Sequence, residues 1–206
     1  DGDGGDGDGG DGGGPFRDPP ASPLVIDLDG DGIELTSRDG SSVFFDLNVD
    51  GFAERTGWVQ ADDGLLALDV NGNGQIDDNY ELFGNMTGFD DGFSQLAELD
   101  SNDDGVIDSN DDLFDELRVW RDLDQDGISD DGELQSLSET GIASIDLGAD
   151  QVSETNLEHL VSHRSTVQFD DGTSGLIEDI HFQTHKNRSV ALLPDDFEYH
   201  PDALAL

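Results

Sequence analysis

The chain has 206 residues, with 50 acidic side chains against 8 basic ones and a formal net charge of −42 at pH 7. This charge excludes nucleic acid and anionic membrane surfaces as partners, because both bind basic faces. Membrane insertion is excluded as well, because no apolar run approaches the length of a spanning helix. The chain contains no Cys, which excludes disulfides and thiolate metal sites.

The acidic residues are mainly aspartates, 39 of them against 11 glutamates. Aspartate favours turns and short-range clusters of oxygen atoms, whereas solvated acidic helices favour glutamate. The 11 Phe and 2 Trp, with many Leu and Ile, are enough to form a hydrophobic core. The composition therefore indicates a folded protein that binds cations.

Three segments are expected along the chain. Residues 1–18 begin with a run of Asp and Gly that has no apolar side chain to bury, so they are predicted to be a flexible linker. Residues 19–189 are predicted to form one module. Residues 190–206 contain two prolines and are predicted to be a tail.

Within the module, short apolar runs alternate with acidic turns. Apolar spacing typical of helices occurs at 93–99 and at 113–120. Strands are predicted at 43–45, 58–59, 65–68, 142–145, 160–169 and 176–183, and the last two flank a turn that indicates a hairpin. We therefore predict an α+β fold, in which several EF-hand-like calcium loops are joined by short strands and helices, with a C-terminal β-hairpin.

A motif of alternating Asp or Asn that ends in Gly occurs five times. We name the copies loop 1 (27–38), loop 2 (46–57), loop 3 (69–81), loop 4 (100–111) and loop 5 (122–133). In a calcium loop, oxygens at positions 1, 3 and 5 converge, Gly at position 6 permits a sharp turn, and an acid at position 12 closes the shell. One such motif can be a turn that binds nothing, but five motifs favour metal binding.

Loops 4 and 5 match the calcium pattern best. The predicted ligands of loop 5 are Asp122, Asp124, Asp126, the Ile128 carbonyl, Asp130 and Glu133. Those of loop 4 are Asp100, Asn102, Asp104, the Val106 carbonyl, Asp108 and Asp111. Since the predicted helix 113–120 leaves loop 4 and enters loop 5, the two loops are expected to form a helix–loop–helix pair.

The other three loops depart from the pattern at the closing acid. Loop 3 offers Asp69, Asn71, Asn73, Gln75, Asp77 and Glu81, with its closing acid at position 13. Loop 2 offers Asp46, Asn48, Asp50 and Glu54, and loop 1 offers Asp27, Asp29 and Asp31. Loops 1 and 2 lack an acid at position 12, so they are expected to be completed by distant oxygens or to share one site. In total, about three to five Ca²⁺ are expected, and folding is expected to depend on them.

Three stretches resemble a known family. The runs SPLVIDLDGDGI (22–33), DVNGNGQID (69–77) and LRVWRD (117–122) resemble the calcium-dependent self-processing module of FrpC-type RTX proteins. The same kind of module occurs in large secreted bacterial calcium-binding proteins and adhesins. The resemblance implies a secreted or cell-surface location in a bacterium.

The resemblance also implies a single-turnover autoproteolytic reaction at an Asp–Pro bond. The Asp carboxyl attacks its own carbonyl to form a cyclic anhydride, which is hydrolysed or captured by a lysine amine. Because Lys186 is the only lysine, a lysine-bearing protein acceptor would act in trans.

This sequence departs from the family at the scissile bond, where the register places Ser22 and Pro23. Serine cannot form the anhydride. Asp18 and Pro19, four residues upstream, are the candidate catalytic pair. The alternative is a non-catalytic structural or adhesion module that calcium makes rigid.

The histidines are spaced in two pairs of four residues, His159 with His163 and His181 with His185. Such spacing can bind zinc on a helix. Both pairs fall in segments predicted to be strand or loop, so these histidines are expected to be surface side chains.

Overall fold

A computed structural model describes residues 22–86 and 88–191 of the chain. Strands account for 39% of the structure, and the described residues contain a single short α-helix. The predicted α+β fold with EF-hand helices is therefore wrong, because the acidic loops join strands. The linker predicted at 1–18 lies outside the described residues, and strand β14 (Thr184–Ala191) crosses the predicted start of the tail at residue 190.

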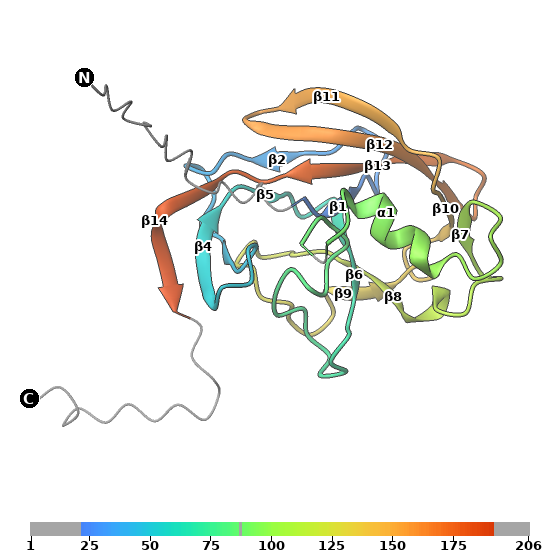
Figure 1. Cartoon of the computed structure of the whole chain (residues 1–206), viewed down its shortest axis with the longest axis horizontal. Helices are drawn as coiled ribbons and strands as arrows, with labels where there is room; N and C mark the ends of the chain where they lie inside the picture. Colours follow the sequence, from blue (N-terminus) through green and yellow to red (C-terminus); the bar gives the residue numbers. More distant parts are fainter. Residues whose placement is uncertain (1–21, 87, 192–206) are drawn as a thin grey trace, which may run out of the picture.

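The main element is a curled, antiparallel sheet of nine strands (Figure 1). Its strand order is β7-β10-β12-β13-β1-β6-β8-β9, and β11 pairs with β12. Its strands are β1 (Leu24–Ile26), β6 (Gly64–Leu68), β7 (Val106–Asp108), β8 (Leu117–Trp120), β9 (Leu134–Ser136), β10 (Ile142–Asp146), β11 (Asp150–Asn156), β12 (His159–Phe169) and β13 (Ser174–His181).

Two small sheets and three short helical segments complete the described fold. One small sheet has the order β14-β4-β3, and the other pairs β2 with β5. The bounds are β2 (Leu35–Thr36), β3 (Phe44–Phe45), β4 (Phe52–Thr56) and β5 (Trp58–Val59), with helix α1 (Gly92–Leu96) and the 3₁₀ turns η1 (Ala97–Leu99) and η2 (Phe114–Glu116).

The centre of the main sheet is buried on both faces, as the alternation along β1 illustrates. Leu24 and Ile26 belong to the core cluster that contains Phe93 of α1. Val25 points to the opposite face and belongs to the cluster that contains Trp58 and residues of the small sheets. Side chains alternate between the two faces of a strand, so a fully apolar strand fits only at the centre of a three-layered structure.

The predicted helix at 113–120 is wrong in its second half. Residues 114–116 form η2, but residues 117–120 are strand β8, which pairs with β6 and β9. Leu117 and Val119 pack on the α1 side of the sheet, and Trp120 packs on the other side. An alternating pattern of this kind in four residues can match a helical stripe by chance, and here strand pairing determined the outcome.

The other predicted helical segment and the predicted strands are confirmed, and their observed ends lie within a few residues of the predicted ends. The segment 93–99 is helical through α1 and η1, with Asp91 as the N-cap, whose Oδ1 accepts the N–H of Ser94 at 2.8 Å. The predicted C-terminal hairpin is β12 and β13, with Gln168 opposite Ser174 across the turn.

Candidate metal sites

The five loops share one backbone conformation. In each loop, positions 4 and 6 have positive φ, and position 6 is always Gly, with φ between 80° and 104°. In three loops position 4 is not glycine: Val49, Asp103 and Gln125 have φ of 54°, 59° and 59°. A left-handed conformation costs L-residues about 1–3 kcal/mol and is rare for a branched residue such as valine. Because the chain accepts this conformational cost in three of the loops, we infer that the protein requires this turn conformation.

The first carboxylate of each loop organises the turn that follows. In loop 5, Asp122 accepts the N–H of Asp126 at 3.1 Å and that of Gly127 at 2.9 Å. The first aspartates of loops 2, 3 and 4 accept the same two N–H groups, and the one from position 6 lies at 2.8 Å in each loop. In loop 1, Asp27 accepts the N–H of Gly30 at 2.8 Å.

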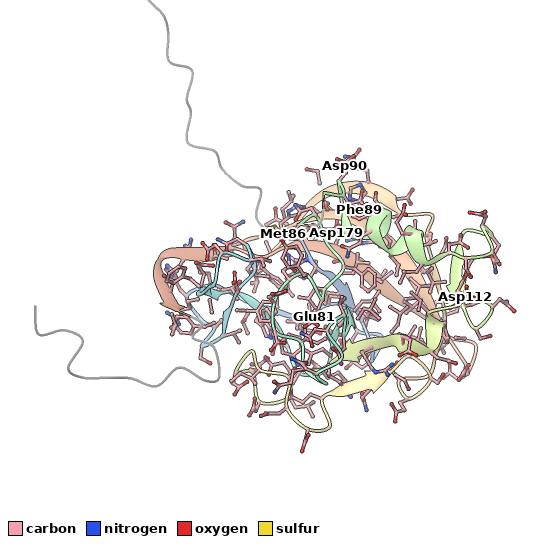
Figure 2. The ribbon with its side chains drawn as sticks, turned by 60° about the horizontal axis from the view of Figure 1, so that its bottom comes forward. Glu81, Met86, Phe89, Asp90, Asp112 and Asp179 are labelled. Atoms are coloured by element: carbon pink, nitrogen blue, oxygen red, sulfur yellow. The ribbon has the colours of Figure 1, made fainter. Side chains whose placement is uncertain are left out.

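The closing acids of loops 3, 4 and 5 accept hydrogen bonds from equivalent positions of their loops. Glu133 accepts the N–H of Leu123 at 2.7 Å and that of Asp130 at 3.1 Å, which are loop positions 2 and 9. Asp111 accepts from positions 2 and 9 of loop 4, both at 2.9 Å. Glu81 (Figure 2) accepts from positions 2 and 9 of loop 3 at 3.1 and 2.9 Å. The extra residue of loop 3 therefore lies between loop position 9 and the closing acid.

Loop 1 is closed by an acid that sequence reasoning missed. Asp63, from the turn before β6, accepts the N–H of Leu28 at 3.3 Å and that of Glu34 at 2.8 Å. Its side chain is fully buried, and one carboxylate oxygen each from Asp27, Asp29 and Asp63 lie within 4.8 Å of one another. The pairing of β1 with β6 explains this position, because it sets Ile26 opposite Gly64.

Two further groups of carboxylates converge at the predicted ligands. Oxygens of Asp46, Asp50 and Glu54 lie within 4.8 Å of one another in loop 2, as do those of Asp122, Asp124 and Glu133 in loop 5. Burial raises the pKa of Glu54 to about 7 and raises the pKa of Asp122. These carboxylates lie close enough together to share a cation.

The remaining predicted ligands are placed as follows. Asn48, Asn102, Asp104 and Asp126 accept backbone N–H groups inside their own turns. Asn71 and Asn73 both donate to Asp77, at 3.1 and 2.7 Å.

Asp31 is exposed next to Asp29, Gln75 lines a cavity, and the Val106 carbonyl belongs to β7. Ile128 is exposed, Asp100 and Asp108 accept N–H groups in loop 4, and Asp18 and Pro19 lie outside the described residues.

Both tryptophans connect loop 5 to the core. Trp58 Nε1 donates to Oδ2 of Asp122 at 2.7 Å, and Trp120 Nε1 donates to Oε2 of Glu133 at 3.4 Å. The two rings are 5.5 Å apart, edge to face, and Phe45 packs against both. The first and last acids of loop 5 are thus oriented by the centre of the core.

The hydrogen bond from Trp58 to Asp122 should contribute both to stability and to calcium binding at loop 5. Replacing Trp58 by Phe keeps most of the buried ring but removes the donor to Asp122. We expect a loss of about 1–2 kcal/mol in the free energy of unfolding and weaker calcium binding at loop 5. Calcium titration followed by the fluorescence of Trp120 measures the change. A Trp58→Phe variant that binds calcium as tightly as the parent would show that this hydrogen bond does not orient the loop.

The Ser22–Pro23 peptide bond directly precedes β1, a central strand of the main sheet, and is held tightly. Ser22 is buried, and the Pro23 carbonyl accepts the N–H of Ile180 at 3.1 Å. A Cβ atom on Gly84 would lie 2.6 Å from the Ser22 carbonyl oxygen, so only glycine fits there. The Asp179 carboxylate lies beside the Ser22 side chain and accepts the N–H of Gly92 at 2.6 Å.

These features define an antiparallel β module whose strands are joined by Asp-rich turns of one shape. The model of the SPM domain family matches residues 24–183, and the chain belongs to this family. The chain is 46% identical over 167 residues to the iron-regulated protein FrpA of Neisseria meningitidis serogroup C, a match that covers 77% of this chain and 15% of that relative. Both findings agree with the resemblance to FrpC-type modules. Among the described residues, no helix is long and apolar enough to cross a membrane.

Proposed function

We propose that this chain is a calcium-binding module of an exported RTX-type protein and that it folds when calcium enters its loops. The observation that carries the proposal is buried negative charge without a protein cation. Asp63, Asp122 and Glu133 are almost completely buried. Among the side chains that the structure describes, which do not include those of residues 186–188 and 191, none of the ion pairs includes a loop carboxylate.

Electrostatics explain why a divalent cation would complete these loops. A buried carboxylate without a counter-charge costs several kcal/mol. Hydrogen bonds to backbone N–H groups use only part of the lone-pair capacity of each carboxylate. Oxygen-rich loops of irregular geometry suit Ca²⁺, which accepts six to eight oxygen ligands. Five ions would reduce the net charge from −42 to −32.

The experiment that tests the proposal compares the protein in chelator with the protein in millimolar Ca²⁺. We expect a loss of β-sheet circular dichroism and of cooperative unfolding in chelator, and recovery of both when calcium is added. Mg²⁺ at the same concentration serves as the control and should restore less, because it demands octahedral geometry. Identical spectra in chelator and in calcium would refute calcium-dependent folding.

The buried acids also predict an unusual pH dependence for the metal-free protein. Burial raises the pKa of Asp63 to about 7 from its ordinary value of 3.8, so between these values the folded state binds more protons than the unfolded state. Stability in chelator should therefore increase as pH falls from about 7 towards 4. The β-sheet circular dichroism of the protein in chelator, recorded at several pH values, measures this trend as a partial return of the folded signal. A metal-free protein that becomes less stable over the same range would contradict it.

The self-processing reaction depends on which residue precedes Pro23. Ser22 occupies the position of the scissile aspartate in the family register, so we propose that calcium makes the module rigid without cleaving the bond before Pro23. Cleavage after Asp18 stays a prediction, because Asp18 and Pro19 lie outside the described residues. Mass spectrometry of calcium-treated protein distinguishes the two, because cleavage would remove the first 18 residues. Transfer to a lysine-bearing acceptor requires that cleavage.

A further inference from the structure

Polar side chains from three elements converge beside Ser22, away from the five loops. His163 on β12 and Asp179 on β13 are cross-strand partners, and His181 lies two residues further along β13, on the same face as Asp179. Asp91, the N-cap of α1, faces them, and one ligand atom each from Asp91, His163 and Asp179 lie within 4.8 Å of one another. In Figure 2, Asp179 lies near the segment with Phe89 and Asp90 that leads into α1.

A β-bulge produces this arrangement. The register of β12 against β13 shifts between Val161 and His163, so Ser162 is an extra residue. Without the bulge, His163 would share the face of Val161, which packs into the cluster around Trp58. The extra residue turns His163 to the opposite face, where Asp179 lies. Bulges commonly redirect a side chain near functional sites.

The hydrogen bonds of His163 leave one ring nitrogen available. The Ser162 hydroxyl donates its single hydrogen to the main-chain carbonyl of Asp179 at 3.4 Å. Nδ1 of His163 lies 3.2 Å from the same hydroxyl, in a contact whose direction depends on the tautomer of the ring. In the tautomer with its hydrogen on Nδ1, this contact leaves the lone pair on Nε2, which is how a second hydrogen bond prepares a histidine to bind a metal.

Two buried oxygen atoms at this place lack a hydrogen-bond partner. Asp179 and Ser22 are both fully buried. Oδ2 of Asp179 accepts the N–H of Gly92, but its Oδ1 and the hydroxyl of Ser22 make no hydrogen bond of good geometry. Nε2 of His181 is 3.8 Å from Oδ1, too far for a direct bond. The Ser22 hydroxyl lies beside this carboxylate but is not aligned to donate to it. Buried polar atoms are nearly always satisfied, so a carboxylate oxygen without a well-aligned donor indicates room for a further ligand.

We propose that Asp91, His163, Asp179 and His181 bind one divalent transition metal ion, with zinc as the representative probe. Two imidazoles with two carboxylates form a donor set that suits Zn²⁺, Co²⁺ or Fe²⁺, whereas Ca²⁺ prefers an all-oxygen shell. The two aspartates balance the charge of the ion. The site is distinct from the calcium loops, and the inference does not rest on their function.

The test is a titration of the untagged full chain in saturating calcium, which keeps the loops from capturing the probe. Calorimetry with Zn²⁺ should give one ion per chain, and Co²⁺ should give the visible absorption of a site with nitrogen ligands. His163→Ala and His181→Ala should each weaken binding at least about tenfold. His185→Ala is the matched control, because His185 contacts Asp39 in another part of the molecule.

Two results would overturn the proposal. One is the absence of stoichiometric zinc binding by the calcium-saturated protein. The other is unchanged zinc affinity in both His163→Ala and His181→Ala. Circular dichroism of each variant in calcium confirms that it is folded, and it also separates a failure of the zinc site from a failure of calcium-dependent folding.

Discussion

An Asp63→Ala variant is expected to lose about 3 kcal/mol or more in the free energy of unfolding, measured by urea titration in saturating calcium. The Asp63 carboxylate is the buried acceptor for the backbone N–H groups of Leu28 and Glu34, and each unpaired buried donor costs about 1–3 kcal/mol. Calorimetry should also show that the variant binds one calcium ion fewer than the parent, because loop 1 loses its closing acid.

An exposed aspartate outside the loops provides a matched control. Asp115 lies in η2, and Asp115→Ala removes one carboxylate without touching a loop. Its effect on unfolding should remain within about 0.5 kcal/mol, as for most surface substitutions. If Asp63→Ala unfolds at the same urea concentration as Asp115→Ala and binds as many calcium ions as the parent, Asp63 does not close loop 1.

Asp63 also shows how far the sequence could predict the candidate sites. The positions of all five turns follow from local spacing, because their oxygens and glycines lie within one short segment. The acid that closes loop 1 is 36 residues beyond Asp27 and reaches it only because β1 pairs with β6. Long-range pairing of this kind leaves no periodic signal in the sequence.

The grouping of the histidines could not be predicted from the sequence for a related reason. A spacing of four residues brings two histidines together only on a helix, and a strand separates such residues by about 13 Å. The β12–β13 hairpin instead brings one member of each pair, His163 and His181, to the same place.

The prediction that His159 lies at the surface is wrong, because His159 is fully buried. Its Nδ1 accepts the N–H of Gln183, so its Nε2 donates to the Thr36 carbonyl at 2.9 Å.

The predicted α+β fold class is wrong because helices flank such loops in EF-hands, whereas strands flank them here. In this chain, loop 2 joins β3 to β4, and loop 5 joins β8 to β9. In both turns, backbone N–H groups donate to a carboxylate a few residues away in the same turn. A turn stabilised in this way fits between strands as well as between helices, so the motif does not determine what flanks it.

A Ser22→Asp variant is expected to cleave itself before Pro23 when calcium is added, whereas the parent chain remains intact at this bond. The resemblance to self-processing modules implies that an aspartate here attacks its own carbonyl carbon, forms a five-membered anhydride and releases the proline nitrogen, which takes up a proton. The surrounding structure is already fixed: Gly84 packs against the Ser22 carbonyl, and Ile180 holds that of Pro23. Orientation of this kind can contribute several kcal/mol to a reaction within the chain.

Mass spectrometry after calcium addition measures the outcome, since cleavage would separate residues 1–22 from the rest of the chain. Ser22→Asn is the matched control, because asparagine has the size of aspartate but cannot form the anhydride. Adding chelator before calcium should prevent cleavage, because the fold that orients residue 22 would be absent. A Ser22→Asp protein that folds in calcium by circular dichroism and yet keeps its full mass would show that the substituted serine is not what prevents processing in this chain.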